Sequence, residues 1–249
     1  MEGLQKAVMK SKRYALKYGQ KLNLSQLYLR LISDKIYLRK EIEKYGKRES
    51  KNLINEEKIA LAKKLVKKHL IKMKGIIMVG ISGSVAAEAA EKGEDIDLLI
   101  ITKADELWWN RLYLRIYILF KGIPHRIFGK KEKENEFCFN LWLDENNLEM
   151  PVSKRNLKNA MDLVMMKVIW DKDNSYQKFL EANKWANKYV ATGYKYRKNG
   201  KKIKFKKQYK NVMKKIINVI LFSGQYLYMR MKNKKILVNL GQAFFHEDN

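Results

Sequence analysis

The sequence is poor in cysteine, in long apolar runs and, outside its centre, in acidic residues. Its single cysteine, Cys138, excludes an internal disulfide framework and a cysteine-based zinc site. No stretch has the roughly 20 consecutive apolar residues of a membrane span, and the longest run near the C-terminus, residues 216–222, is interrupted by Asn218. The first 20 residues alternate lysines with apolar residues and do not resemble a signal peptide. These absences predict a cytoplasmic protein without a membrane partner.

The scarcity of acidic residues gives the chain a large positive charge. Its 249 residues include 53 Lys and Arg against 26 Asp and Glu, for a net charge of +27. The charge is unevenly divided, with +14 in residues 1–74, −4 in residues 75–150 and +17 in residues 151–249. Such a field attracts polyanions, so the basic flanks favour RNA as a partner. The alternative is that the lysines only solvate exposed helix faces.

The hydrophobic pattern divides the chain in the same places as the charge. We expect a basic helical region over residues 1–74, an α/β core over residues 75–150 and a basic helical region over residues 151–249. A chain of this size, with 46% hydrophobic residues, can bury one good core and carry smaller flanking modules. Within the core, apolar runs predict buried strands, and two stretches between them predict helices. The expected strands are 76–79, 96–101 and 136–143, and the expected helices are 85–92 and 107–120. The fold class is therefore α+β, with a small sheet flanked by helical regions.

One constellation in the core carries chemistry, namely Gly83-Ser84, then ten residues, then Asp95-Ile96-Asp97. Side chains alternate along a strand, so Asp95 and Asp97 project from one face. Two adjacent carboxylates repel each other unless a cation lies between them. Oxygen ligands of this kind suit Mg²⁺, which also accepts substrate phosphate oxygens. The pair is therefore a candidate catalytic and metal-binding site.

The turn before this strand is a candidate phosphate-binding site. Ser82, Gly83 and Ser84 lie where a strand is expected to turn into a helix. Backbone N–H groups and the helix dipole favour a triphosphate at such a place, and glycine permits a close approach. The alternative is that Gly83 is only a tight bend and that residues 93–95 are only a polar turn.

The order strand, Gly-Ser, helix, Asp-x-Asp strand resembles the signature of the DNA polymerase β nucleotidyltransferase superfamily. The segments GISGSVAAEAAEKGEDIDLLIIT and FNLWLDENNL are also similar to blocks of a group of microbial nucleotidyltransferase-domain proteins. The similarity covers roughly residues 20–190 and the C-terminal tail. It implies a polymerase β-type sheet, a nucleoside triphosphate substrate and nucleotidyl transfer that depends on Mg²⁺ or Mn²⁺. It names no acceptor.

The resemblance also implies a third carboxylate on a neighbouring strand, and here the sequence departs from the pattern. Even positions of the expected strand share a face, which makes Glu136, Asn140 and Asp144 the options. Asn140 stands where the acid is expected. An amide is a weaker metal ligand than a carboxylate and cannot act as a base, so activity would be low, would use one metal or would be lost.

Three functions are compatible with these features. The first is a metal-dependent nucleotidyltransferase that moves a nucleoside monophosphate from a triphosphate to a hydroxyl acceptor, with RNA favoured by the charge. The second is a weak or inactive nucleotide- or RNA-binding module, and the third is an antitoxin-like nucleotidyltransferase that modifies a partner protein. Candidate RNA contacts are lysines interleaved with Phe205 and Tyr209, although a solvated loop is equally compatible. They are Lys201, Lys202, Lys204, Lys206, Lys207 and Lys210. The sequence leaves the nucleotide, the acceptor and the oligomeric state open.

Overall fold

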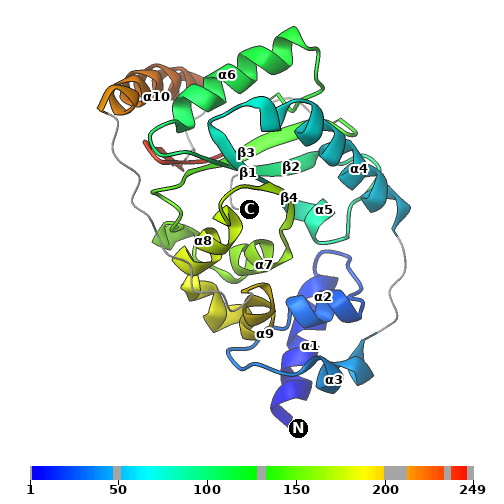
Figure 1. Ribbon diagram of the computed structural model, residues 1–249. Coiled ribbons are helices and arrows are strands. Elements are labelled where there is room, and N and C mark those ends of the chain that lie inside the picture. Colours follow the sequence, from blue (N-terminus) through cyan, green and yellow to red (C-terminus); the bar gives the residue numbers. More distant parts are fainter. Residues whose placement is uncertain (1, 47–51, 128–132, 199–211, 233–236, 246–249) are drawn as a thin grey trace.

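A computed structural model describes residues 2–46, 52–127, 133–198, 212–232 and 237–245. It is an α+β structure with one six-stranded mixed sheet (Figure 1). The strands are β1 (Ile76–Ile81), β2 (Ile96–Thr102), β3 (Phe137–Asp144), β4 (Lys167–Asp171), β5 (Leu237–Asn239) and β6 (Gln242–Phe244). The helices before β3 are α1 (Glu2–Leu16), α2 (Leu24–Leu29), α3 (Arg39–Ile42), η1 (Glu43–Tyr45), α4 (Leu53–Lys68), η2 (Leu70–Lys72), α5 (Gly83–Ala86) and α6 (Leu107–Phe120). Those after it are η3 (Val152–Lys154), α7 (Leu157–Met165), α8 (Ser175–Ala182), η4 (Lys184–Ala186), α9 (Asn187–Arg197) and α10 (Val212–Lys232).

The strands lie in the order β4-β1-β2-β3-β6-β5. β2 and β3 run parallel and are joined by α6, whereas the other neighbours pair antiparallel. All six residues of β1 are buried, and so are all residues of β2 except Asp97. Strands covered on both faces need such continuous apolar runs. The three strands and the helix 107–120 expected from the sequence are thus confirmed.

Helices cover both faces of the sheet. α4, α5, α6 and α10 pack on one face, where Ile96, Leu98 and Ile100 of β2 point. α7, α8 and α9 pack on the other face, against Leu99 and Ile101. Because residues two apart on a strand share a face, Asp97 belongs to the face covered by α7.

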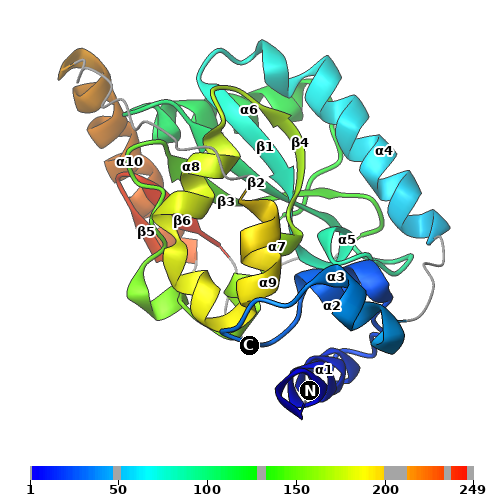
Figure 2. The ribbon, with the colours of Figure 1, turned by 60° about the horizontal axis from the view of Figure 1, so that its bottom comes forward.

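Residues 2–46 fold around a separate small core, and they dock on the α7 side of the molecule. Their core contains Leu4, Val8, Leu27 and Leu31, among others. The N–H of Ser33 donates to the carbonyl of Tyr189, and the N–H of Ala191 donates to the carbonyl of Ser33, both over 2.9 Å. Figures 1 and 2 both show α2 next to α5, and the side chain of Gln26 donates to the carbonyl of Ala87 at 3.1 Å. This module therefore closes one side of the α/β core.

Two expectations about secondary structure were wrong. The helix expected over residues 85–92 is a single turn that ends at Ala86. Side chains from other segments form hydrogen bonds with backbone groups that a longer helix would use itself. Gln26 binds the carbonyl of Ala87, and the N–H of Ala90 donates to the side chain of Asn55 at 3.0 Å. The region 151–249, expected to be helical, also contributes β4, β5 and β6 to the sheet. Among the described helices, none combines the length and the hydropathy of a membrane span.

Candidate functional site

A cavity of about 470 Å³ lies between the β2–β3 face of the sheet, α7 and the N-terminal helices. Its wall contains all three residues of the predicted turn, together with Asp97 and Asn140. The three turn residues are Ser82, Gly83 and Ser84. Segments that lie more than 50 residues apart in the sequence thus meet at one concave site, which has the size of a small-molecule pocket.

Gly83 lies directly against Asp97. Its φ is +64°, in the left-handed region that favours glycine. A Cβ atom at this position would lie 2.3 Å from the Oδ2 atom of Asp97. The N–H of Ser82 also donates to the backbone carbonyl of Asp97 at 3.0 Å. Glycine is therefore required here both for the backbone conformation and for the close approach of the turn to the carboxylate.

Ser84 is held by the segment that precedes the acidic strand. Its hydroxyl donates to the Oε2 atom of Glu94 at 2.6 Å, and the same oxygen accepts the N–H of Glu91 at 3.1 Å. Glu94 thereby ties the turn to the start of β2. The helix dipole that was expected to attract phosphate is small, because α5 has only four residues.

Asp95 lies on the same side of β2 as Asp97, but it has a different environment. Its side chain is 8% exposed, and its Oδ2 atom accepts a hydrogen bond of 2.9 Å from the guanidinium of Arg126. Burial and the charge of Asp97 raise the pKa of Asp95, whereas Arg126 opposes the rise. Asp97 lines the cavity, and Asp95 lies beside it against Arg126. No local sequence pattern identifies Arg126. It is placed at the site by a contact with a distant segment, in which its backbone N–H donates to the carbonyl of Phe137.

Asn140 reaches Asp97 because β3 contains a bulge. Asp97 pairs with Cys138, but Leu99 pairs with Leu141, so β3 has one residue more than β2 over this interval. Asn140 and Leu141 consequently turn toward the same face, and a bulge of this kind re-aims a side chain. The amide nitrogen of Asn140 donates to the Oδ1 atom of Asp97 at 2.6 Å. The residue expected at the third-acid position is therefore in direct contact with the predicted metal ligand.

The bulge also overturns the expectation that Asp144 shares a face with Asn140. The extra residue reverses the alternation, so Asp144 pairs with Thr102 at the far end of β3. There its two carboxylate oxygens accept the N–H groups of Asp105 (2.6 Å) and Asn146 (2.8 Å). Glu136 precedes β3, where its carbonyl accepts the N–H of Ile96. Neither acid lines the cavity.

The structure adds an acid and several basic residues that the sequence patterns did not identify. Asp162 of α7 lines the cavity, and burial raises its pKa to about 6, with the charge of Asp97 adding to the rise and Lys158 and Arg30 opposing it. Arg30 and Lys154 are buried in the same wall. An acidic residue within an amphipathic helix resembles a solvated position, so only the packing of α7 on the sheet identifies Asp162.

The donor atoms at the site fit a small, hard divalent cation. Carboxylate oxygens of Asp95 and Asp97 and the sulfur of Cys138 all lie within 4.8 Å of one another. Paired carboxylates suit Mg²⁺. Burial, and then the charges of Asp97 and Asp95, raise the pKa of Cys138, so the sulfur stays a thiol and is a poor ligand. Asp95 and Asp97 are therefore the residues that would hold a cation.

The lysines proposed as RNA contacts lie outside the described residues. These are Lys201, Lys202, Lys204, Lys206, Lys207 and Lys210.

Comparisons with known proteins add no assignment. No protein-family model matches the chain, and neither a curated protein nor a solved structure is significantly similar to it. Any function must therefore be argued from the residues of the cavity.

Proposed function

We propose that the chain binds a nucleoside triphosphate in this cavity and transfers its nucleotidyl group to a hydroxyl acceptor. The observation that carries the proposal is the packing of the Gly83 turn against Asp97 within one cavity. The turn and the carboxylate of Asp97 line the same cavity, so a phosphate chain bound there would contact both. Asp95 and Asp97 would hold Mg²⁺ or Mn²⁺, which supplies charge neutralisation for the phosphates.

Basic residues of the wall suit a triphosphate. Arg30 follows α2, Lys154 ends η3 and Lys158 lies in the first turn of α7, so three separate segments bring positive charge to one cavity. Arg30 is held by a hydrogen bond of 2.7 Å from its guanidinium to the side chain of Gln20. Arg30 and Lys154 are buried, whereas Lys158 is exposed at the rim. Buried cations that are fixed before the substrate arrives stabilise developing charge more effectively than mobile surface lysines.

We assign Asp162 as the general base that removes the proton of the acceptor hydroxyl. Asn140 cannot remove a proton, because an amide has no basic site. A group whose pKa lies near 6 is ionised at neutral pH and is still basic enough to act as a general base. In the proposed reaction, the acceptor oxygen bonds to the α-phosphorus, its proton moves to Asp162, and pyrophosphate leaves with the electrons of the broken P–O bond.

The test separates nucleotide binding from transfer. Purified protein is incubated with Mg²⁺ or Mn²⁺, each α-labelled nucleoside triphosphate and total cellular RNA, and calorimetry measures nucleotide affinity separately. We expect Asp97→Asn to remove both cation-dependent binding and transfer. Asp162→Asn should reduce transfer by roughly 10²–10⁴-fold, the usual contribution of a general base, and should leave nucleotide affinity almost unchanged. Asp34→Asn, an exposed matched control outside the cavity, should behave like the wild type. If Asp97→Asn binds the nucleotide with unchanged affinity, the proposal is wrong.

A second candidate function is nucleotide binding without turnover. Two contacts favour it, since Arg126 neutralises Asp95 and the amide of Asn140 occupies an oxygen of Asp97. Asn140→Asp distinguishes the two candidates. A wild-type protein that binds nucleotide but transfers nothing to any acceptor, together with an Asn140→Asp variant that gains transfer, would establish the binding module. Transfer by the wild type would establish the enzyme.

A further inference from the structure

α6 carries exposed aromatic rings on the side that borders the end of α4. Tyr117 points there, since its hydroxyl lies 2.8 Å from the Nδ1 atom of His69, the residue that follows α4. Tyr113 and Phe120 lie four and three residues from Tyr117, so they share its side of the helix. The rings of Tyr113 and Tyr117 are 6.2 Å apart. Tyr113 is 46% exposed and Phe120 is 85% exposed. α10 contacts a different side of α6, through Trp108.

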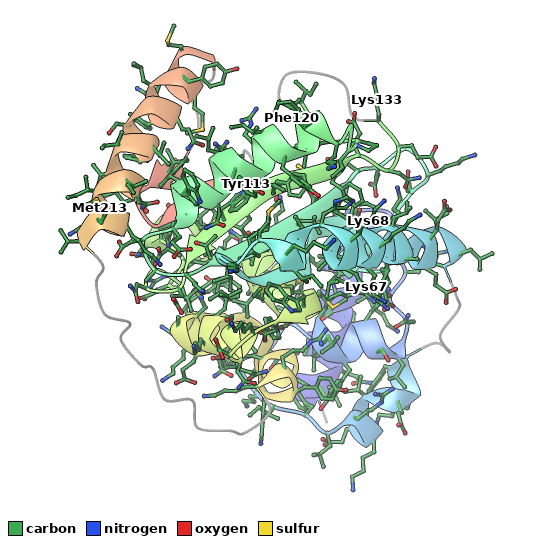
Figure 3. The ribbon with its side chains drawn as sticks, turned by 45° about the horizontal axis from the view of Figure 1, so that its top comes forward. Lys67, Lys68, Tyr113, Phe120, Lys133 and Met213 are labelled. Carbon is green, nitrogen blue, oxygen red and sulfur yellow. The ribbon has the colours of Figure 1, made fainter. Side chains whose placement is uncertain are left out.

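The end of α4 brings lysines to these rings. Every exposed side chain of α4 from residue 63 onward is a lysine. Lys68 of α4, Lys72 of η2 and Lys121, directly after α6, converge on His69, because burial and then the charges of these three lysines lower the pKa of the histidine. Figure 3 looks onto α4 and α6 together, with Lys67 and Lys68 on one helix and Tyr113 and Phe120 on the other.

Six of these residues define what we name the α4–α6 face. They are Lys68, Lys72, Tyr113, Tyr117, Phe120 and Lys121. None of them lines the cavity that contains Asp97. The face is therefore a separate feature, and an inference from it does not rest on nucleotidyl transfer.

The charges of this face have one sign. Residues 58–75 and 107–124 contain ten Lys and Arg and no Asp or Glu, and eight of the ten are exposed. Glu106, just before α6, is 15% exposed and is bound by Lys214 at 2.5 Å. Glu57 lies in the first half of α4, about 16 Å along the helix axis from Lys68. That distance exceeds the Debye length of about 8 Å at physiological salt, so Glu57 does not neutralise the face.

We propose that the α4–α6 face binds single-stranded RNA, with bases stacked on Tyr113 and Phe120 and phosphates beside the lysines. Aromatic rings next to a row of cations are the combination by which proteins hold single strands, since every base has a π-face and every nucleotide has a phosphate. RNA is the occupant because its loops and ends expose unpaired bases that stack on aromatic side chains.

Other occupants fit the face less well. A membrane interface takes up apolar side chains, but the exposed part of α4 from Lys63 to Lys68 offers only lysines and would hold the rings of α6 away from the hydrocarbon. A second copy of this chain would place cations opposite these cations, which is unfavourable. RNA satisfies both the rings and the lysines.

The experiment measures fluorescence anisotropy of a labelled RNA of 20 uridines, which does not fold, with the full chain at several salt concentrations. We expect Tyr113→Ser/Phe120→Ser to lower the affinity at least roughly fivefold for each lost stack and to keep the salt slope, because no phosphate contact is removed. Lys68→Gln/Lys72→Gln/Lys121→Gln should lower the affinity and flatten the slope of log K against log salt by roughly 0.7 for each lysine that contacts a phosphate. All variants keep the lysines at positions 201–210, so each loss belongs to the face.

Matched controls carry the same changes elsewhere. Lys10→Gln/Lys35→Gln/Lys40→Gln removes three exposed lysines of the N-terminal module, and it should keep the wild-type slope. Met9→Ser/Tyr196→Ser removes side chains that are 60% and 56% exposed, and it should keep the wild-type affinity. Thermal unfolding should show that all variants fold, and calorimetry should show that nucleotide affinity is unchanged in each.

Several results would overturn the proposal. They are a wild-type protein that does not bind the RNA at low salt, an aromatic variant with wild-type affinity, and a lysine variant with the wild-type slope. Binding to single-stranded DNA but not to RNA would assign the face to DNA. Sedimentation with anionic vesicles that only the aromatic variant loses, while its RNA affinity persists, would assign the face to a membrane.

Discussion

At the scale of single residues, the site depends on how closely Gly83 and Asn140 approach Asp97. Gly83 has no Cβ atom, which would otherwise collide with Asp97, and the amide of Asn140 donates a hydrogen bond of 2.6 Å to Asp97. Together they fix the orientation of the carboxylate before any ligand binds. A preorganised carboxylate binds a cation without first losing side-chain entropy.

Gly83→Ala tests this constraint. The added Cβ would be placed 2.3 Å from Asp97, and alanine at a φ of +64° is strained by about 1–2 kcal/mol. We expect a lower melting temperature and a clear loss of cation-dependent nucleotide affinity in calorimetry. Gly93→Ala is the matched control, since a Cβ there meets no atom within 4 Å. Normal nucleotide affinity in Gly83→Ala would show that the turn is only a structural bend.

At the scale of elements, the bulge in β3 divides the strand into two functional halves. Cys138 before the bulge and Asn140 within it face Asp97, whereas Asp144 after the bulge faces the other side of the sheet. Asp144 instead holds the loop that leads into α6, through the N–H of Asp105. Its contribution should therefore be to stability and not to the site.

Asp144→Asn tests this division through its pH dependence. Burial raises the pKa of Asp144 to about 6, although hydrogen bonds from the backbone of Asn146 and Asp105 oppose the rise. Because the folded state holds the proton more tightly than the unfolded chain, this residue should make the wild type less stable as the pH rises from about 4 to about 6. Urea unfolding at several pH values should show a shallower decline for Asp144→Asn, and nucleotide affinity should be unchanged. A variant with the wild-type slope would contradict the assignment.

The sequence predicted those elements whose signal is local. α6 begins and ends at the expected residues, Leu107 and Phe120. β4, β5 and β6 were missed because such short segments carry little local signal, and they form strands only by pairing with the edge of a neighbouring strand. The bulge was missed for the same reason, since register is a property of two strands together. Asp95, Asp97 and the turn could be found from spacing, whereas Arg126 and Asp162 are brought in by distant segments.

At the scale of the whole molecule, the acidic core lies between basic regions, and both regions contribute to the cavity. Arg30 comes from the N-terminal region, and Lys154 and Lys158 come from the C-terminal region. A polyanionic acceptor that reaches the cavity would therefore meet positive charge on either side.

This arrangement predicts RNA binding with a steep salt dependence. Each phosphate that a lysine neutralises releases counterions, so log K should fall by roughly 0.7 per contact for each tenfold rise in salt on single-stranded RNA. Reversal of Lys201, Lys204, Lys206 and Lys207 to glutamate should weaken binding and flatten this slope in filter-binding assays. The affinity for free nucleotide should barely change, because exposed charges beyond a Debye length of about 8 Å are screened. If the wild-type protein fails to bind RNA at low salt, the prediction is wrong, and a protein or small-molecule acceptor becomes the better hypothesis.

The strand order has a consequence for biosynthesis. β1 and β3 are made early, but their outer partners β4 and β6 follow about 90 and 100 residues later. Until those segments leave the ribosome, the nascent sheet exposes two unpaired edges, which are templates for pairing with other chains. Contacts between segments so distant in sequence also form slowly. We therefore expect the nascent chain to depend on chaperones until its last strand has been made.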